Sequence, residues 1–255
     1  MQENPEYFSP YDGSLGKETT TLGKEVFEKL RADILRSHLK PDTKLRFQDL
    51  RDMYGVGLSP LREALSRLAE NRLVIATGQR GFRVTAVSLH DILDISLVRK
   101  EIESLALRLT SRHGDDAWEA RVVAAHHRMV LAEKAGRRVN DEVWEKRHRE
   151  FHHELVSCCC SPCLLHIHQL LSDQFDRYRR LSMEKETADP PRGLIHQEIV
   201  DAMLSRKADL AISLMMAHID NATKSISAAL AESESHRRKH RAGSAVKTRK
   251  AAKSL

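Results

Sequence analysis

The chain has 255 residues, of which 41% are hydrophobic and 31% charged, and its formal net charge is +6. These values are typical of a soluble globular protein with one large domain or two ordinary ones. No apolar run approaches the roughly 20 residues of a membrane span, and the N-terminus lacks the basic and apolar segments of a secretory signal, so we expect a cytoplasmic protein.

The first 20 residues show no periodic pattern of apolar side chains and are rich in Pro, Gly, Ser and Thr. We expect residues 1–20 to form a disordered arm. From Gly23 onward, apolar residues recur at steps of three and four, which predicts a helix that ends near Pro41. A second, shorter helix is predicted for about Phe47–Tyr54.

The third predicted helix begins at Ser59-Pro60 and continues to about Asn71. Serine suits the N-cap, where its hydroxyl accepts a hydrogen bond from a backbone amide, and proline suits the first helical position. A strand at 73–76, a turn at 78–81 and a returning strand at 82–84 follow. Three helices and a two-stranded ribbon predict a winged helix-turn-helix over residues 21–87, with its recognition helix starting at Ser59.

Residues 88–232 are helical by pattern, without the alternation that would predict strands. We expect a mainly α protein in which the winged helix-turn-helix is followed by an all-helical antiparallel bundle of six or seven helices. Residues 233–255 are basic and poor in apolar side chains, which predicts a disordered tail. The net charge is +5 over residues 21–87, −3 over residues 88–232 and +7 over residues 233–255. The first part could therefore bind a polyanion while the bundle has another task.

Four histidines of the bundle attract attention. His148 and His152 are four residues apart, so on a helix both side chains leave the same face. His196 and His218 lie in two helical segments that a turn near Lys207 could make antiparallel. Neutral imidazole is the commonest metal ligand, and three or four of them can form a site inside a bundle. One alternative is that each is an ordinary surface or hydrogen-bonded histidine, and another is that the four line an empty cavity.

The four cysteines lie between positions 158 and 163 in the run CCCSPC. Such crowding does not indicate a disulfide framework and fits a reducing compartment. The run could be a soft-metal or redox site, or a group of small residues that ends a helix before Pro162. No separate cysteine pair completes a four-thiolate zinc site, which favours the second interpretation.

Several segments resemble a known family. VFEKLRADIL, LKPDTKL, YGVGLSPLREALSRL and NRLVIATGQRGFRV resemble the DNA-binding domain of GntR-type bacterial transcription regulators. LVRKEIESLALRL, REFHHELV, SPCLL, HQEIVDAM and MAHI resemble the FadR-like effector domain, often called FCD. The resemblance implies a homodimeric repressor that binds a palindromic operator and responds to a small organic acid.

The resemblance also implies which residues contact DNA. Gln48 stands where arginine is frequent on the second helix, and Leu58 stands where these regulators usually have arginine. Leucine can touch a thymine methyl group or pack, whereas arginine reads guanine through two hydrogen bonds. Leu58 could equally be a turn residue that contacts nothing. The positions expected to contact DNA are Gln48, Ser59, Arg62, Arg80 and Gly81.

In the effector domain, the resemblance implies a divalent metal held by one Asp and three His. The position of the Asp is occupied here by His148, so the expected ligands are four imidazoles: His148, His152, His196 and His218. Nitrogen ligands favour a divalent transition metal, zinc or nickel foremost, over magnesium or calcium.

Two charged residues are expected beside this metal. Arg99 matches the arginine that neutralises a small carboxylate effector, and Glu103 could hold Arg99 or support a metal-bound histidine. An ordinary surface pair of residues four apart is the alternative.

We expect no enzymatic activity. His153-Glu154 lacks the second histidine of an HExxH zinc motif, because Ser157 occupies that position. Neither a glycine-rich phosphate loop nor a Ser/His/Asp pattern stands out in the sequence. Two alternatives remain: a metal-dependent enzyme with a DNA-binding tether, and a DNA-binding protein without sequence preference.

Overall fold

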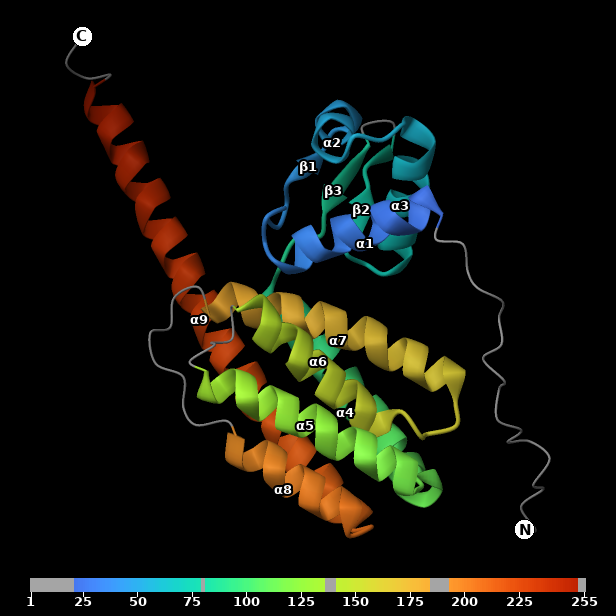
Figure 1. The fold of residues 1–255 in the computed structure, drawn as a ribbon. Helices are drawn as coiled ribbons and strands as arrows, with labels where there is room; N and C mark the ends of the chain where they lie inside the picture. Colours follow the sequence, from blue (N-terminus) through green and yellow to red (C-terminus); the bar gives the residue numbers. More distant parts are fainter. Residues whose placement is uncertain (1–20, 79–80, 136–140, 184–192, 252–255) are drawn as a thin grey trace, which may run out of the picture.

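The computed structural model describes residues 21–78, 81–135, 141–183 and 193–251, and no side chains beyond Ser235. The expected arm at 1–20 lies outside the described residues. The N-terminal part contains the elements α1 (Leu22–Leu35), β1 (Lys44–Leu45), α2 (Phe47–Tyr54), α3 (Leu58–Glu70), β2 (Val74–Ala76) and β3 (Phe82–Val84) (Figure 1).

The sheet of the N-terminal part has three strands in the order β1-β3-β2, and both pairings are antiparallel. Lys44 lies opposite Arg83, and Val74 lies opposite Val84. The predicted two-stranded ribbon is therefore wrong in one respect: the sheet has a third, short strand, β1. A strand of two residues carries no periodicity, and β1 forms only because β3 offers it a partner.

The start of α3 also differs from the prediction. The helix begins at Leu58, and its N-cap is Gly57, which makes no side-chain hydrogen bond. Ser59 is thus the second helical residue rather than the N-cap. The left-handed backbone of Gly55 (φ 66°) ends α2. After this turn the helical conformation of α3 begins at Leu58, one residue before the Ser59-Pro60 pair.

The small core of the winged helix lies between α1 and α3. The apolar face of α1, with Leu30 and Ile34, packs on Leu61, Leu65 and other buried residues of α3. These side chains are at most 1% exposed. Burial of each side chain stabilises the fold by about 1.5–3 kcal/mol. These contributions offset the conformational entropy that so small a domain loses on folding.

The second part is an all-helical bundle. Its six described helices are α4 (Leu89–His113), α5 (Asp116–Lys134), α6 (Glu142–Val156), α7 (Pro162–Met183), α8 (Gly193–Leu204) and α9 (Ala208–Ala251). Side chains of Ser88, Asp115 and Asp141 accept backbone hydrogen bonds at the starts of α4, α5 and α6. The mainly α architecture predicted from the pattern is confirmed. Of the described helices, none is long and apolar enough to cross a membrane.

The C-terminal prediction is corrected. Residues 233–251, expected to be disordered, continue α9 as one helix to Ala251. Arginine, lysine and alanine are strong helix formers, and no proline interrupts the segment. The segment has few apolar side chains that could pack against the bundle, but this does not prevent it from forming a helix.

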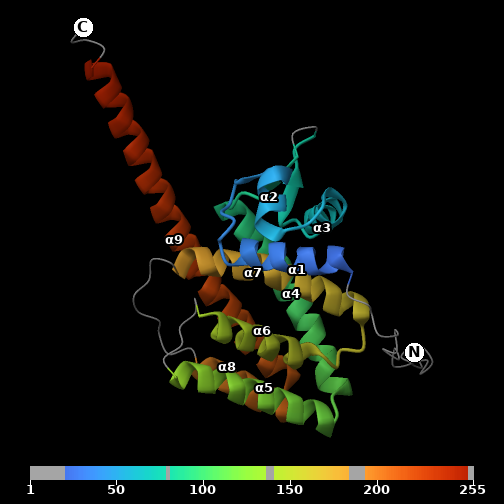
Figure 2. The same cartoon turned by 45° about the horizontal axis from the view of Figure 1, so that its top comes forward.

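Helix α7 lies between the winged helix and the rest of the bundle (Figures 1 and 2). All residues from Ser172 to Arg180 are buried, although most are polar or charged. On the winged-helix side, both oxygens of Asp173 accept hydrogen bonds from Arg31 of α1. Gln174 donates to the carbonyl of Asn71 at 3.2 Å, and Arg177 donates to the carbonyl of Thr85. One helix therefore joins the two parts through polar contacts.

Candidate functional site

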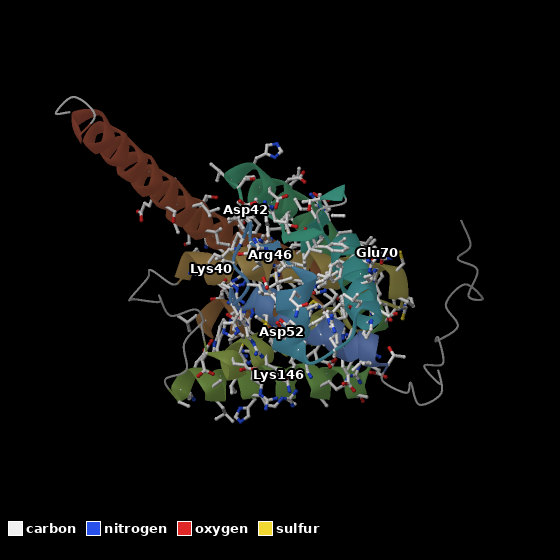
Figure 3. All side chains as sticks on the ribbon, turned by 90° about the horizontal axis from the view of Figure 1, so that it is seen from above. Lys40, Asp42, Arg46, Asp52, Glu70 and Lys146 are labelled. Atoms are coloured by element: carbon white, nitrogen blue, oxygen red, sulfur yellow. The ribbon has the colours of Figure 1, made fainter. Side chains whose placement is uncertain are left out.

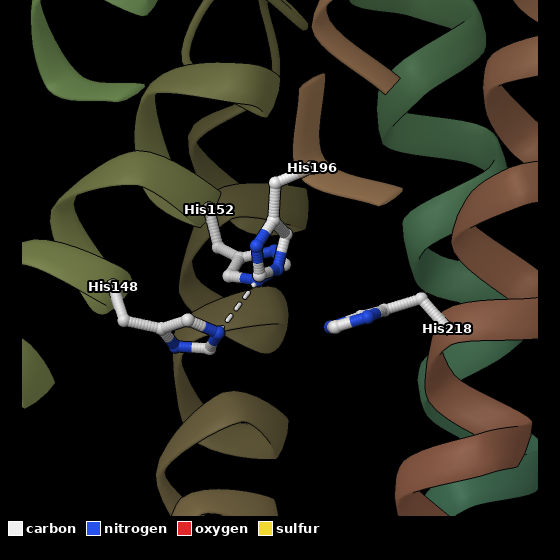
Figure 4. Close-up of side chains that lie close together, drawn as sticks. All are labelled: His148, His152, His196 and His218. Atoms are coloured by element: carbon white, nitrogen blue, oxygen red, sulfur yellow. Dashed lines mark hydrogen bonds between the residues drawn. The ribbon is translucent and has the colours of Figure 1, made fainter. Parts of the chain in front are cut away.

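Three helices bring the four histidines together. His148 and His152 come from α6, His196 from α8 and His218 from α9 (Figure 4). One ring nitrogen from each lies within 4.8 Å of those from the others. The Nε2 atoms of His148 and His152 are 3.2 Å apart. Residues separated by up to 70 positions thus form one cluster in the bundle.

Three of the four histidines are shielded from solvent, and the fourth, His218, is half-buried. His148 is 7% exposed, His152 4% and His196 fully buried. Burial, together with the neighbouring histidines, lowers the pKa of both His148 and His152 well below the usual range. These two imidazoles are therefore neutral at pH 7, which leaves a nitrogen lone pair on each available to a cation.

The donor set fits a transition-metal ion. In a tetrahedral site with bonds of about 2.1 Å, the ligand nitrogens lie about 3.4 Å apart, close to the separation of His148 and His152, and the four ligand atoms here all lie within 4.8 Å of one another. Two neutral Nε2 atoms at 3.2 Å repel each other unless a proton or a cation lies between them. The buried Nδ1 atoms of His148 and His152 have no hydrogen-bond partner among the described residues. A ring of imidazoles without such an ion would leave several polar atoms unsatisfied.

Aromatic rings hold the cluster in position. The indole of Trp144 stacks on His148 with ring centres 4.6 Å apart. Phe151 lies 5.2 Å from His152 and 5.3 Å from His196, again between ring centres. Trp144 and Phe151 are almost completely buried. The imidazoles therefore have little freedom to turn away.

Arg99 and Glu103 form a buried pair, so the alternative of a surface pair is wrong. Arg99 is 6% exposed and donates to the fully buried Glu103 at 3.3 Å. The Nε2 atom of His168, on α7, lies 3.1 Å from the same carboxylate. Burial raises the pKa of Glu103, but His168 and Arg99 outweigh this and hold the pKa at about 2. The histidine next to Glu103 is thus His168, which is not one of the four in the cluster.

A cavity of about 300 Å³ opens beside the histidines. Its lining includes His148, His218, Arg99, Phe175, Asp176 and Arg179. The Nε atom of Arg99 and the Nε and Nη1 atoms of Arg179 are buried without a hydrogen-bond partner in the described part of the chain. Unsatisfied guanidinium donors next to neutral imidazoles suit an anion.

Arg179 and its two acidic partners were not predicted from the sequence. Arg179 donates to Glu145 of α6 at 2.7 Å and to Asp176 at 3.0 Å. Although burial lowers the pKa of Arg179, these carboxylates raise it above its usual value. In the sequence, DQFDRYRR resembles a solvated helix face, because dense charge is normally exposed. Only the packing of α7 on both sides reveals Asp176 and Arg179 as cavity residues.

Three of the residues expected to contact DNA, Gln48, Ser59 and Arg62, are exposed on the winged helix. Arg62 is exposed on α3, and its guanidinium lies 5.4 Å from the ring centre of Phe47. Ser59 is exposed on the first turn of α3, and Leu58 is 46% exposed. Gln48 is exposed on α2 and donates to Asp52.

Charged side chains surround these positions. Figure 3, seen from above, shows Arg46 and Asp52 with other charged residues over this part of the chain. The surface therefore offers both positive charge for phosphates and polar groups for bases.

The turn between β2 and β3 is described only at its ends. Arg80 lies outside the described residues. Gly81 has φ 93°, in the region that favours glycine, and its carbonyl accepts hydrogen bonds from the amide and the hydroxyl of Thr77. Gly81 thus shapes the wing through its backbone.

Comparison with known protein families gives two matches. Residues 22–84 match the family described as bacterial regulatory proteins, gntR family. Residues 94–221 match the FCD domain. The first range covers the winged helix, and the second covers most of the bundle, including all four histidines of the cluster.

Two curated relatives extend over most of the chain. The HTH-type transcriptional regulator BphR of Paraburkholderia xenovorans strain LB400 is 37% identical over 207 residues, which cover 79% of this chain and 83% of the relative. The HTH-type transcriptional repressor GlaR of Escherichia coli strain K12 is 36% identical over 206 residues, which cover 78% and 93%.

Solved structures share the architecture. A putative GntR transcriptional regulator from Rhodococcus sp. RHA1 superposes with a TM-score of 0.67 at 20% identity, covering 80% of this chain and 96% of the other. E. coli McbR/YncC gives a TM-score of 0.69 at 17% identity, with coverage of 84% and 99%. At these identities the likeness concerns the fold.

Proposed function

Because the chain belongs to the gntR family of bacterial regulatory proteins and carries an FCD domain, we propose that it is a repressor controlled by a small carboxylate. The carboxylate binds at a metal-containing pocket of the bundle and changes the affinity of the winged helix for a palindromic operator. The observation that carries the proposal is the histidine cluster beside an arginine-lined cavity, whose wall includes residues of α7, the helix that holds Arg31 of the winged helix. A repressor of this kind works in the cytoplasm, next to the chromosome.

Four imidazoles would hold a divalent transition metal, for which zinc and nickel are the first candidates. A bound metal would supply an electrophilic position for one carboxylate oxygen. The chain itself orients the acid: the unsatisfied donors of Arg99 and Arg179 neutralise its charge. Glu103 keeps Arg99 in place by a buried ion pair. The side chain of Phe175 forms an apolar wall of the same cavity.

DNA binding combines two kinds of contact. Lysines and arginines of the winged helix neutralise phosphates, and the first turns of α3 enter the major groove. Arg62 reads a base, Ser59 and Gln48 add polar contacts, and Leu58 touches a thymine methyl group. Arg80 and Gly81 of the wing approach the minor groove.

A second copy of the chain completes the DNA-binding unit. Leu89, Leu93 and Leu97 of α4 are 40–59% exposed and lie at steps of four residues, so they share one helix face. Helix α4 follows the winged helix directly in the chain. Pairing two copies of this face would set two winged helices near each other, as the two halves of a palindrome require.

Placing a charge in this leucine face is expected to separate the copies. In Leu97→Glu, burial of a carboxylate at the interface opposes association, so light scattering after gel filtration should give the mass of one chain. Val123→Glu, at a 47% exposed position of α5, is the matched control and should keep the mass of the wild type. A Leu97→Glu protein with the mass of two chains would contradict this interface.

Helix α7 is the route from the cavity to the winged helix. Phe175, Asp176 and Arg179 line the cavity, whereas Asp173 holds Arg31 of α1 through two hydrogen bonds. An acid that draws Arg179 away from its carboxylates would shift α7 and with it the contacts to α1. The ligand changes DNA affinity only to the extent that it binds the two arrangements unequally.

Operator binding with and without carboxylate tests the function and this route together. In the wild type, an acid that raises the melting temperature is expected to weaken operator binding, within the 5–150-fold typical of coupled sites. In Asp173→Asn, which removes a charge and keeps the size, the same acid should still bind but change operator affinity less than about 3-fold. Glu28→Gln is the matched control and should keep the wild-type response. Glu28 also forms an ion pair with Arg31, at 3.6 Å, but it is exposed and lies on α1, the helix that carries Arg31.

The outcomes are distinct. No response of operator binding to any tested mono- or dicarboxylate would refute the proposed function. An unchanged response in Asp173→Asn would refute only the route through α7. Conversion of the acid into a product would favour a metal-dependent enzyme instead.

A further inference from the structure

The C-terminal part of α9 carries a strong positive charge that the proposed function leaves unused. Between His236 and Lys250 the sequence has seven lysines and arginines and no aspartate or glutamate. The preceding residues include Glu232 and Glu234, so the charge changes sign abruptly there. We call residues 236–251 the basic arm.

The basic arm extends away from the bundle. Leu230 is the last residue of α9 that packs against the bundle core among the described side chains. From Ser235 to Ala251 the helix is about 24 Å long, at about 1.5 Å per residue. In both views it leaves the bundle on the side that carries the winged helix and reaches beyond the level of α2 (Figures 1 and 2).

The charge pattern of the basic arm opposes its helix, although many of its residues are good helix formers. Isolated helices of this length are marginal in water, and like charges four residues apart, as at Arg237 and Arg241, destabilise them further. Gly243 costs about 1 kcal/mol relative to alanine. The arm contains no acidic residue that could compensate. A partner with dense negative charge would remove this repulsion.

We propose that the basic arm binds the phosphates of duplex DNA that flanks the operator. Duplex DNA carries one negative charge per about 1.7 Å, so about 24 Å of arm spans about seven base pairs. The arm lies on the same side of the molecule as α2 and the winged helix (Figures 1 and 2). It therefore extends the DNA contact beyond the bases that α3 reads, and it adds affinity without adding sequence preference. The inference rests on the proposed function only in taking DNA as the ligand.

Removal of the arm tests this inference. One variant ends at Ser235, and a second replaces Arg237, Arg238, Lys239 and Arg241 by glutamine, which preserves helix propensity. Binding is measured over a range of salt concentrations to an operator duplex with no flank and to one with about 15 base pairs on each side. The slope of log K against log salt falls by about 0.9 for each lost phosphate contact.

For the full chain, the flanked duplex should bind at least about tenfold more tightly than the short one. Both variants should lose this gain. For each arm that touches the flanked duplex, the salt slope should fall by up to about 3 to 4 in the glutamine variant and by more in the truncated one. Their preference for the operator over a scrambled duplex of equal length should stay unchanged, because α3 is intact.

Equal salt slopes for the full chain and both variants would overturn the inference. The inference would also be overturned if the full chain, but not the variants, bound anionic phospholipid vesicles while the salt slope of DNA binding was the same in all three proteins. A flank effect that the full chain shows and both variants lose, together with no preference for the operator in any of the three proteins, would support the arm and contradict the proposed sequence-specific function.

Discussion

Replacing His152 by alanine is expected to remove the metal while the helical fold persists. The side chain contributes one of four imidazoles and lies 3.2 Å from the Nε2 atom of His148. Loss of a residue that only supports a ligand lowers metal affinity about 10–100-fold, so loss of a ligand itself should exceed that range. Elemental analysis after dialysis should fall from about one ion per chain to less than about a tenth.

The neighbouring histidine provides a matched control. His153 is exposed on α6 and is not one of the four clustered histidines, so His153→Ala should keep the full metal content. Thermal unfolding gives a second measurement of metal binding, because an ion that binds only the folded state raises the melting temperature. A chelator should lower this temperature in the wild type and in His153→Ala, but not in His152→Ala. Unchanged metal content in His152→Ala would refute the assignment of the site.

Replacing Arg62 by alanine should remove most of the specific operator affinity. Arg62 is exposed on the first half of α3 and stands in LREAL, the stretch that resembles the recognition helix of the family. An arginine that contacts guanine through two hydrogen bonds contributes about 1–3 kcal/mol per half-site, so a dimer loses roughly 30-fold to 20,000-fold in affinity. Fluorescence anisotropy with operator and scrambled duplexes measures this loss.

The loss should be specific to sequence rather than to charge. Lys29→Ala removes one exposed positive charge from α1 and should weaken binding to both duplexes equally and slightly. Arg62→Ala should bring operator affinity close to scrambled affinity, with an unchanged far-UV circular dichroism spectrum. Operator preference equal to that of the wild type would show that Arg62 does not read a base.

Much of the fold could be predicted because its signals are local. Apolar steps of three and four residues define α1 and α4, and Gly78 and Gly81 mark the wing turn through their positive φ angles. A helix boundary is less certain, since Gly57 and Ser59 both suit an N-cap and the geometry after Gly55 decides between them. Strand β1 has no local signal and depends on its partner strand.

The candidate site could be predicted only in part. The four-residue spacing of His148 and His152 guarantees a shared face once α6 is helical. His196 and His218 join them because α8 and α9 pack against each other, which their apolar patterns already favour. The same reasoning fails for Arg179 and Asp176, because charged residues on a helix normally face water.

The sequence by itself determined the order of helices, the winged helix-turn-helix and the identity of the four clustered histidines. These depend on backbone propensity and helical periodicity, which act over a few residues. Only the tertiary structure decided that α7 is enclosed on both sides. Its Asp173 thereby faces the winged helix, and its Arg179 faces the cavity. Burial is a property of what packs around a helix, and for charged residues it becomes possible only when partners such as Arg31 and Glu145 arrive from distant parts of the chain.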